Sequence, residues 1–483
     1  MAFLQRTMNR GSVSTGYNID NSLKFEADNS EYLKWTNISS YATSARKKTF
    51  SFSVWFKITE TGVQRTIWAN QANGYLLLQA DGQLKWQQSY GGVVKTLNTN
   101  RLFRDTSAWY NVIIAVDTTQ STESNRQRLY VNGVEETSLT STTYPSQNDE
   151  ADNIYEGFHS LGAYNASSIF WSGYMANVAF ISDAQITPSD VGEFDEDSGI
   201  WIPKEYSGGS APSYFLEFKD SSDLGTATGL DADTLNNITA ADQSTDTPTN
   251  NFATLNPLFM YSASAGALPI ISEGATVLTT QQSGYWHNSV STIPVTSGKW
   301  YFEAQPGTSS THVTAIGYGD EEDVYTWGVA NSHVGASSTK SFAYLGSDTA
   351  GSSYGRIFPG DSSPSTRVNY TSSNIIGVAI DADNGYVYWS KDGTFINSGD
   401  PTSGSSGTGG YAVPSGTGTN GILIPSIAAY HHTSLAKIFI NFGGYTTISI
   451  SSSASDANGY GTFEYAPPTG YYALCGKNLA EYG

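Results

Sequence analysis

The chain has 483 residues, which is too long for a single hydrophobic core and predicts two or three domains. Lysine and arginine number 24 and aspartate and glutamate 44, so the formal net charge of -20 disfavours nucleic acid and anionic membrane surfaces as partners. Charged residues make up only 14% of the chain and aromatic residues 13%, which excludes a coiled coil and a disordered acidic chain.

Residues 1–19 are expected to form an N-terminal arm. They carry Arg6 and Arg10 but no apolar stretch, so we predict neither a secretory signal nor a membrane anchor. Cys475 is the single cysteine, which excludes an internal disulfide. Packing or assembly must therefore hold the protein together.

Alternation of apolar and polar residues predicts strands through most of the chain. In residues 49–58 (TFSFSVWFKI), an apolar side chain occupies every second position, which is typical of a strand with one buried face. Four tight-turn dipeptides follow strand-like runs and predict hairpins: Asp81-Gly82, Asn132-Gly133, Asn384-Gly385 and Asp392-Gly393. One convincing helix start, a Thr cap before a Pro, lies at residues 187–190. The sequence therefore predicts an all-β protein.

The first part of the chain resembles the laminin-G-like, concanavalin-A-like jelly roll. Five phrases carry the resemblance in order: 23–33 (LKFEADNSEYL), 50–57 (FSFSVWFK), 109–114 (WYNVII), 129–133 (LYVNG) and 169–178 (IFWSGYMANV). The resemblance implies an antiparallel β-sandwich.

The second part resembles the SPRY domain, which is also a β-sandwich. The matching phrases are 297–303 (SGKWYFE), 376–381 (IGVAID), 388–393 (YWSKDG), 437–443 (KIFINFG) and 467–471 (PPTGY). Insertions at 320–364 and 397–421 lengthen the chain where that family is short. Because loops carry recognition, the binding surface of the family is not transferred to this chain.

A segment of different composition lies between the two regions that resemble known families. Residues 195–251 are acidic and rich in turn-forming residues, and they are predicted to form a connector with one clear strand, 214–218. We therefore expect two antiparallel, jelly-roll-like β-sandwiches with the following layout: arm 1–19, laminin-G-like sandwich 20–194, connector 195–251, SPRY-like sandwich 252–474 and C-terminal tail 475–483.

The whole chain, from its MAFLQRT start through 248–258 (PTNNFATLNPL), resembles virion proteins of marine tailed phages. The resemblance implies a tail-fibre, tail-spike or head-fibre protein on the outer surface of the virion, made in the cytoplasm of the bacterial host. Its expected partners are other virion proteins, further copies of itself, for instance in a trimer, and a glycan or protein of the host surface. Capsid decoration or a tail collar without a receptor role, and a polysaccharide depolymerase, are the alternatives.

Residues 26–31 have the Glu-x-Asp-x-x-Glu spacing of laminarinase-type glycosidases, which need paired carboxylates. The intervening residues Ala27, Asn29 and Ser30 are typical of a turn, whereas a cleft-lining strand would have apolar residues at these positions. We therefore interpret the segment as a turn and predict no catalytic residue. The histidines of the chain also lack a zinc-ligand spacing.

Calcium is the one cofactor that the sequence does not exclude, since hard cations bind clustered oxygen atoms and the chain has a run of carboxylates. The candidate ligands form one acidic run: Asp320, Glu321, Glu322 and Asp323. The alternative interpretation is a solvated loop without a cofactor.

Glycan binding is predicted from aromatic rings near amide, acidic and histidine side chains, because sugar rings stack on aromatic faces. The candidates belong to the acidic run, follow it or precede the strand at 437: Asp320, Tyr325, Trp327, Tyr430, His431 and His432. The alternative is that these rings anchor loops or belong to the core.

Overall fold

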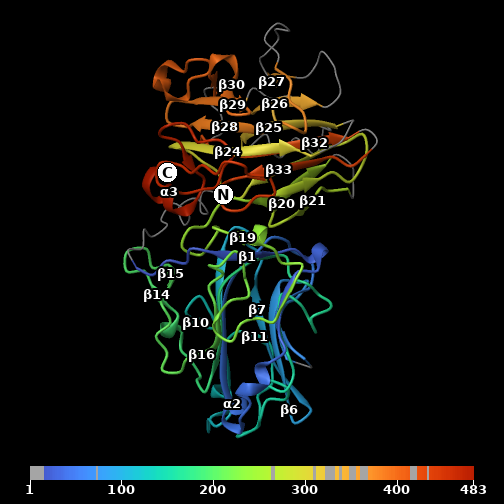
Figure 1. Ribbon diagram of the computed structural model, residues 1–483, viewed down its shortest axis with the longest axis vertical. Helices are drawn as coiled ribbons and strands as arrows, with labels where there is room; N and C mark the ends of the chain where they lie inside the picture. The colour runs from blue at the N-terminus through green and yellow to red at the C-terminus, as the bar shows by residue number, and fades with distance from the viewer. Residues whose placement is uncertain are drawn as a thin grey trace. The chain divides into compact units, whose positions relative to one another are not determined.

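The computed structural model describes residues 16–71, 74–262, 267–307, 312–320, 332–336, 340–347, 355–358, 368–413, 421–431 and 434–483. The chain divides into two compact units, with the boundary between Asn251 and Phe252. Within the described residues both units are built from β-sheets whose pairings are antiparallel, apart from one short parallel contact between residues 300–301 and 472–473. This confirms the predicted all-β class. Figure 1 colours the first unit from blue to green and the second from yellow-green to red.

The strands of the first unit have the following bounds: β1 Ser22–Phe25, β2 Tyr32–Trp35, β3 Thr49–Ile58, β4 Arg65–Asn70, β5 Tyr75–Leu78, β6 Gln83–Tyr90, β7 Val93–Leu102, β8 Trp109–Asp117, β9 Gln127–Val131, β10 Val134–Glu135, β11 Leu139–Thr142, β12 His159–Leu161, β13 Gly173–Ser182, β14 Gly192–Phe194, β15 Trp201–Pro203, β16 Pro212–Leu216, β17 Thr228–Gly229, β18 Thr234–Asn236 and β19 Gln243–Ser244. In the described residues one sheet runs β10-β9-β8-β3-β13-β1-β19, with β16 and β17 attached through β13. The other runs β11-β7-β6-β5-β4-β12-β2-β18.

Aromatic side chains from both sheets meet in the core of the first unit. The ring centroids of Phe52 and Trp68 lie 5.6 Å apart, and those of Trp68 and Trp86 lie 5.7 Å apart. Trp35 stacks on Tyr214 at 4.3 Å. All five side chains are fully buried. The large aromatic content of the chain therefore fills a sandwich core, which stabilises the fold through apolar burial.

The predicted strand at residues 49–58 is confirmed as β3, but both of its faces are buried. It lies between β8 and β13 in the sheet. On its outer side, Ser51 Oγ donates to the carbonyl of Ala184 and accepts from the amide of Ile186. The segment after β13 thus covers the face that the alternation pattern assigned to solvent.

Residues 195–251, expected to be a connector, instead complete the first sandwich. Within this segment β16 pairs with β13, β18 with β2 and β19 with β1. Two of its acids are buried against lysines of the first strands: Asp242 lies 2.8 Å from Lys24 Nζ, and Asp246 lies 2.7 Å from Lys57 Nζ. Acidic, turn-rich sequence resembles an exposed linker, and only the fold shows that these carboxylates have buried cationic partners.

The second unit packs two further sheets, with strands β20 Leu255–Ser262, β21 Ile270–Ser272, β22 Val277–Thr279, β23 Trp286–Ser291, β24 Lys299–Pro306, β25 His312–Asp320, β26 Phe342–Ser347, β27 Arg356–Phe358, β28 Ile376–Asp381, β29 Tyr386–Lys391, β30 Thr394–Phe395, β31 Tyr411–Ala412, β32 Leu423–His431, β33 Lys437–Asn441 and β34 Tyr472–Ala473. Its described strands form the orders β20-β23-β32-β25-β26-β27 and β21-β22-β33-β24-β28-β29-β30. Trp300, Phe302 and Trp389 lie in the shared core.

All four predicted hairpin turns join paired strands. They connect β5 to β6, β9 to β10, β28 to β29 and β29 to β30. The second residue of each turn is a glycine with positive φ, for example Gly82 at 93° and Gly133 at 80°. Glycine reaches this backbone conformation at no steric cost, which explains why the dipeptides predicted the turns correctly.

Helices are few and short. The predicted start at residues 187–190 is a 3₁₀ turn, Pro188–Asp190, with a capping box from Thr187. Two α-helices were not predicted: α2 Ser44–Lys48, and α3 Gly476–Tyr482, which occupies the expected C-terminal tail. In the expected arm 1–19, residues 1–15 lie outside the described residues, and Ile19 is buried. No helix in the described ranges is long and apolar enough to cross a bilayer.

The buried lysine of β1 gives a stability prediction. Lys24 Nζ lies 3.2 Å from Glu31 and 2.8 Å from Asp242, and all three side chains are almost completely buried. Lys24→Met leaves two buried carboxylates without their cation, which costs about 3–5 kcal/mol of unfolding free energy. The control Lys219→Met removes an exposed partner of Glu217 and costs less than about 1 kcal/mol. Denaturant unfolding measures both, and equal losses would contradict the role of the buried cluster.

His159 gives a pH prediction. Burial lowers the pKa of His159 to about 4, in spite of a hydrogen bond with the Ile154 carbonyl. Above pH of about 6.5 the ring is neutral in both states, and as the pH falls towards 4 only the unfolded chain takes up the proton. The first unit therefore loses about 3 kcal/mol of stability over this window.

Denaturant unfolding of wild type and His159→Gln between pH 7 and pH 5 checks this loss. Glutamine does not titrate and can still donate to the Ile154 carbonyl, so the variant should show a weaker dependence on pH. An unchanged slope in the variant would rule out His159 as the cause.

Candidate functional site

The residues predicted to bind glycan in the second unit do not form one described cluster. Asp320 ends β25 and pairs with Leu423, while Tyr430 lies seven residues further along β32 and pairs with Val313. At about 3.3 Å per residue, the two positions are about 23 Å apart along the strand. The structure therefore places Asp320 and Tyr430 at opposite ends of the same strand pair.

The surroundings of the two residues differ as well. Asp320 is fully buried. Tyr430 is half-buried, and its ring centroid lies 5.5 Å from that of Trp286, which is 4.2 Å from the ring of His333. Burial lowers the pKa of His333 to about 4, so this ring is neutral at neutral pH. Tyr430 thus belongs to an aromatic group on its sheet face.

The other candidates of the second unit are not tested. Only the backbone of His431 is described, as the last residue of β32. The rest lie outside the described residues: Glu321, Glu322, Asp323, Tyr325, Trp327 and His432. The described residues contain no group of three acidic, histidine or cysteine side chains placed to hold a metal ion. Calcium binding at the acidic run stays a prediction.

The two carboxylates considered for catalysis, those of Glu26 and Glu31, form hydrogen bonds with neighbouring residues of the fold. Glu31 accepts hydrogen bonds from the Glu26 backbone amide at 2.7 Å and from Asn29 at 2.9 Å, besides its contact with Lys24. Glu26 accepts from Ser172 at 3.3 Å. Burial raises the pKa of Glu31, and Lys24 offsets this only in part. These bonds tie the turn after β1 to the sandwich.

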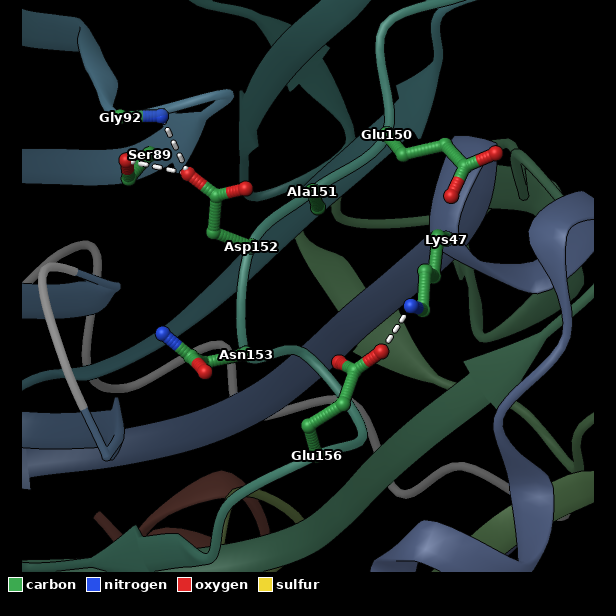
Figure 2. A pocket seen from close by; sticks show the side chains of 8 residues that line it. All are labelled: Lys47, Ser89, Gly92, Glu150, Ala151, Asp152, Asn153 and Glu156. Atoms are coloured by element: carbon green, nitrogen blue, oxygen red, sulfur yellow. Dashed lines mark hydrogen bonds and ion pairs between the residues drawn. The ribbon is translucent and has the colours of Figure 1, made fainter.

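A different group of residues forms a pocket at the rim of the first unit (Figure 2). The cavity has a volume of about 420 Å³, within the range of about 300–1,000 Å³ for small-molecule sites. We call it the rim pocket, and its described lining residues are Lys47, Ser89, Gly92, Glu150, Ala151, Asp152, Asn153 and Glu156. None of these side chains is aromatic or a large aliphatic, so the pocket suits a hydrophilic ligand.

Three segments build the rim pocket. Helix α2 supplies Lys47, the end of β6 and the turn to β7 supply Ser89 and Gly92, and the loop before β12 supplies residues 150–153 and Glu156. The turn needs two glycines, because Gly91 and Gly92 have φ of 56° and 79°. Their N–H groups consequently point towards the loop.

Asp152 binds the turn to the loop. Its carboxylate accepts from Gly92 N and Ser89 Oγ, each at 2.7 Å, and from Gly91 N at 3.0 Å. Burial alone would raise the pKa of Asp152, but these hydrogen bonds outweigh it and hold the pKa below its usual value. A carboxylate offers about four acceptor positions, so one remains for a ligand.

Asn153 is the pocket residue best placed to contact a ligand. It has a φ of 54°, and its half-buried side chain has no hydrogen bond to another described residue. In Figure 2 the amide extends away from Asp152 and from the Lys47–Glu156 ion pair. An amide can donate two hydrogen bonds and accept two, which matches the hydroxyl groups of a sugar.

The rim pocket was not predicted from the sequence. Its residues come from three segments that are far apart in the sequence, and none carries a recognisable motif. The Gly-Gly turn at 91–92 and the acidic run at 149–152 were available as signals. Only the pairing of Asp152 with the turn brings them together.

Comparison with known proteins assigns part of the first unit. Residues 27–192 match the profile Laminin_G_3 of the concanavalin A-like lectin/glucanases superfamily, which supports the laminin-G-like resemblance. All residues that line the rim pocket fall within the matched segment. No curated protein sequence matches the chain.

Several solved structures are similar to parts of this chain. The SPRY domain of human HERC1 is 13% identical, with 38% of this chain and 96% of that chain covered and a TM-score of 0.27. The CBM40 module of Ruminococcus gnavus IT-sialidase is 14% identical, with 35% and 95% covered and a TM-score of 0.25. Domains LG4-5 of mouse laminin alpha1 are 11% identical, with 86% and 84% covered and a TM-score of 0.28.

Proposed function

We propose that the protein binds a hydroxyl-rich glycan in the rim pocket of its first unit and does not cleave it. The observation that carries the proposal is the side chain of Asn153, which lies in a polar cavity without a hydrogen bond to another described residue. The match of residues 27–192 to the concanavalin A-like lectin/glucanases superfamily supports a sugar as the ligand.

The pocket offers the groups that hold sugar hydroxyls. Asn153 can donate and accept, and Asp152 retains an acceptor position. Lys47 supplies a cation on the opposite side, where it pairs with Glu156. Hydrogen bonds fix Asp152 and an ion pair holds Lys47 before the ligand arrives, which lowers the entropic cost of binding.

The carboxylates of the pocket are poorly suited to hydrolysis. A glycosidase needs one carboxylic acid with a raised pKa to protonate the leaving group. Three hydrogen bonds hold the pKa of Asp152 below its usual value, which is the opposite condition. Glu156 pairs with Lys47, and Glu150 lies 3.9 Å from Lys48 and accepts a hydrogen bond from Ser44. These contacts support binding without cleavage.

The resemblance of the whole sequence to virion proteins of tailed phages extends the proposal. On this basis the protein is an external virion component, a fibre or spike, and the glycan belongs to the host surface. Antibody labelling of purified particles is expected to place the protein on their exterior, and added protein is expected to reduce adsorption. Unlabelled particles would overturn this extension and leave the binding activity itself in place.

Asn153→Gly tests the pocket. Glycine accepts the positive φ of this position, so the change removes the amide without straining the backbone. Loss of one or two hydrogen bonds to the ligand should weaken binding about tenfold, which corresponds to about 1.4 kcal/mol. Binding is measured on an array of bacterial surface polysaccharides and then by titration calorimetry with the strongest hit.

The matched control is Asn148→Gly, which makes the same change in the same loop. Asn148 also has positive φ, at 67°, but is exposed and does not line the pocket. The control should bind like wild type, and both variants should unfold at the same temperature. Equal affinity of all three proteins would show that the glycan binds at another site. Release of reducing ends from the bound polysaccharide would show that the protein cleaves its ligand.

A further inference from the structure

The outer face of β5, β6 and β7 carries a second group of polar side chains, separate from the rim pocket. Within these strands Leu76, Leu84, Trp86 and Leu97 point into the core and are buried. Of the alternate residues that face outward, five polar ones are half-buried and form the group: Tyr75, Gln83, Lys85, Gln87 and Asn98. We call it the amide platform. Its members come from three adjacent strands of one sheet. Leu77 of β5 lies on the same face and is buried.

Cross-strand pairing arranges the amide platform in two rows. In the first row Tyr75 is opposite Gln87, and Gln87 is opposite Thr96. In the second row Leu77 is opposite Lys85, Lys85 is opposite Asn98, and Asn98 is opposite Ser141 of β11. Directly opposed side chains lie about 4.5–5.5 Å apart, so each row runs perpendicular to the strands.

The platform side chains hold one another in place. Tyr75 Oη donates to Gln87 Oε1 at 2.6 Å, and Lys85 Nζ lies 5.5 Å from the centre of the Tyr75 ring. Asn98 accepts from Gln79 at 2.8 Å and donates to Gln83 at 3.0 Å. Such bonds fix the rotamers of long polar side chains, which otherwise lose entropy when a ligand binds.

The composition of this face differs from that of the chain. Strands β5, β6, β7 and β11 contain no aspartate or glutamate, although the chain has 44 such residues. Within the described part of the chain no carboxylate pairs with Lys85. Beside the apolar Leu77 and Val94, the face therefore presents amides, hydroxyls, a tyrosine ring and the Lys85 cation, in a protein of strongly negative charge.

We propose that the amide platform is a second glycan subsite, which binds an internal segment of an extended polysaccharide lying across the strands. Neighbouring strands are about 4.8 Å apart, close to the length of one sugar unit in an extended chain, so successive units can meet successive strands. Amides bind the hydroxyls, and Tyr75 supplies a ring face for stacking.

This subsite rests on the proposed function and narrows its ligand class to a polymer. The rim pocket can hold an end or a branch, whereas rows of side chains across three or four strands match a run of sugar units. The end of β6 provides Ser89 to the rim pocket, and the same strand provides Lys85 and Gln87 to the platform. One strand thus contributes to both surfaces.

Chain-length dependence tests the subsite. The probes are size-fractionated oligosaccharides, from disaccharide to octasaccharide, prepared from cellulose, laminarin, alginate and the strongest polysaccharide on the array. Calorimetry on the full chain should show affinity rising at least tenfold from disaccharide to octasaccharide. The double variant Gln87→Ala, Asn98→Ala should abolish this rise while changing disaccharide affinity less than twofold.

The control double variant is Gln64→Ala, Asn148→Ala, which removes two exposed amides elsewhere on the first unit. It should retain the full rise with length, and unfolding temperatures should confirm that all variants fold. Lys85→Ala, tested with the alginate series, should weaken octasaccharide binding about tenfold if the cation contacts a sugar carboxylate.

The outcomes separate the two proposals. If octasaccharide binding depends on Gln87 and Asn98 but not on Asn153, the platform is supported and the rim pocket is not the site. If affinity is independent of length, the platform is overturned and the proposed function stands. A change of oligomeric state in the platform variant with unaltered sugar binding would identify a protein interface instead. Failure of wild type to bind any probe overturns both.

Discussion

The hydrogen-bonded register between β6 and β7 is the constraint on which both proposed binding surfaces depend. Trp86 opposite Leu97 places large apolar residues in the core, and this puts Gln87 and Asn98 on the outer face. A slip of one residue would exchange the two faces. The same register ends in Tyr90 opposite Val93, which leaves Gly91 and Gly92 as the turn that binds Asp152.

Buried carboxylates that contact lysines or backbone amides explain how so acidic a chain folds. Asp242 and Asp246 are buried against Lys24 and Lys57, and Trp109 also donates to Asp246 at 3.0 Å. Burying a carboxylate without a partner is costly, so these contacts specify where residues 242–246 dock. In the second unit Glu303 is buried as well, and it accepts from the backbone amides of Glu464 and Tyr465. Internal acids therefore act as attachment points for the late segments of each unit.

Different kinds of sequence signal succeeded and failed in the two units. Turn dipeptides and period-two strands predicted local structure correctly, because each depends on the conformational preference of one or two residues or on one buried face. The binding prediction for the second unit relied on residues that are near in sequence to strand ends. Antiparallel pairing then placed Asp320 and Tyr430 at opposite ends of β25 and β32. A residue that is close in sequence to the end of a strand can lie at either end of the sheet, and the sequence alone does not show at which.

The sequence by itself determined the all-β class, the hairpin turns, and the laminin-G-like character of the first unit, since these reside in local patterns of side chains. The tertiary structure alone decided that residues 195–251 belong to the first sandwich, and that Ser89, Asp152 and Asn153 share a pocket. The physical reason is that burial, ion pairing and cross-strand register are relations between distant segments. A turn-rich acidic segment has the same local composition whether its carboxylates meet water or a buried lysine.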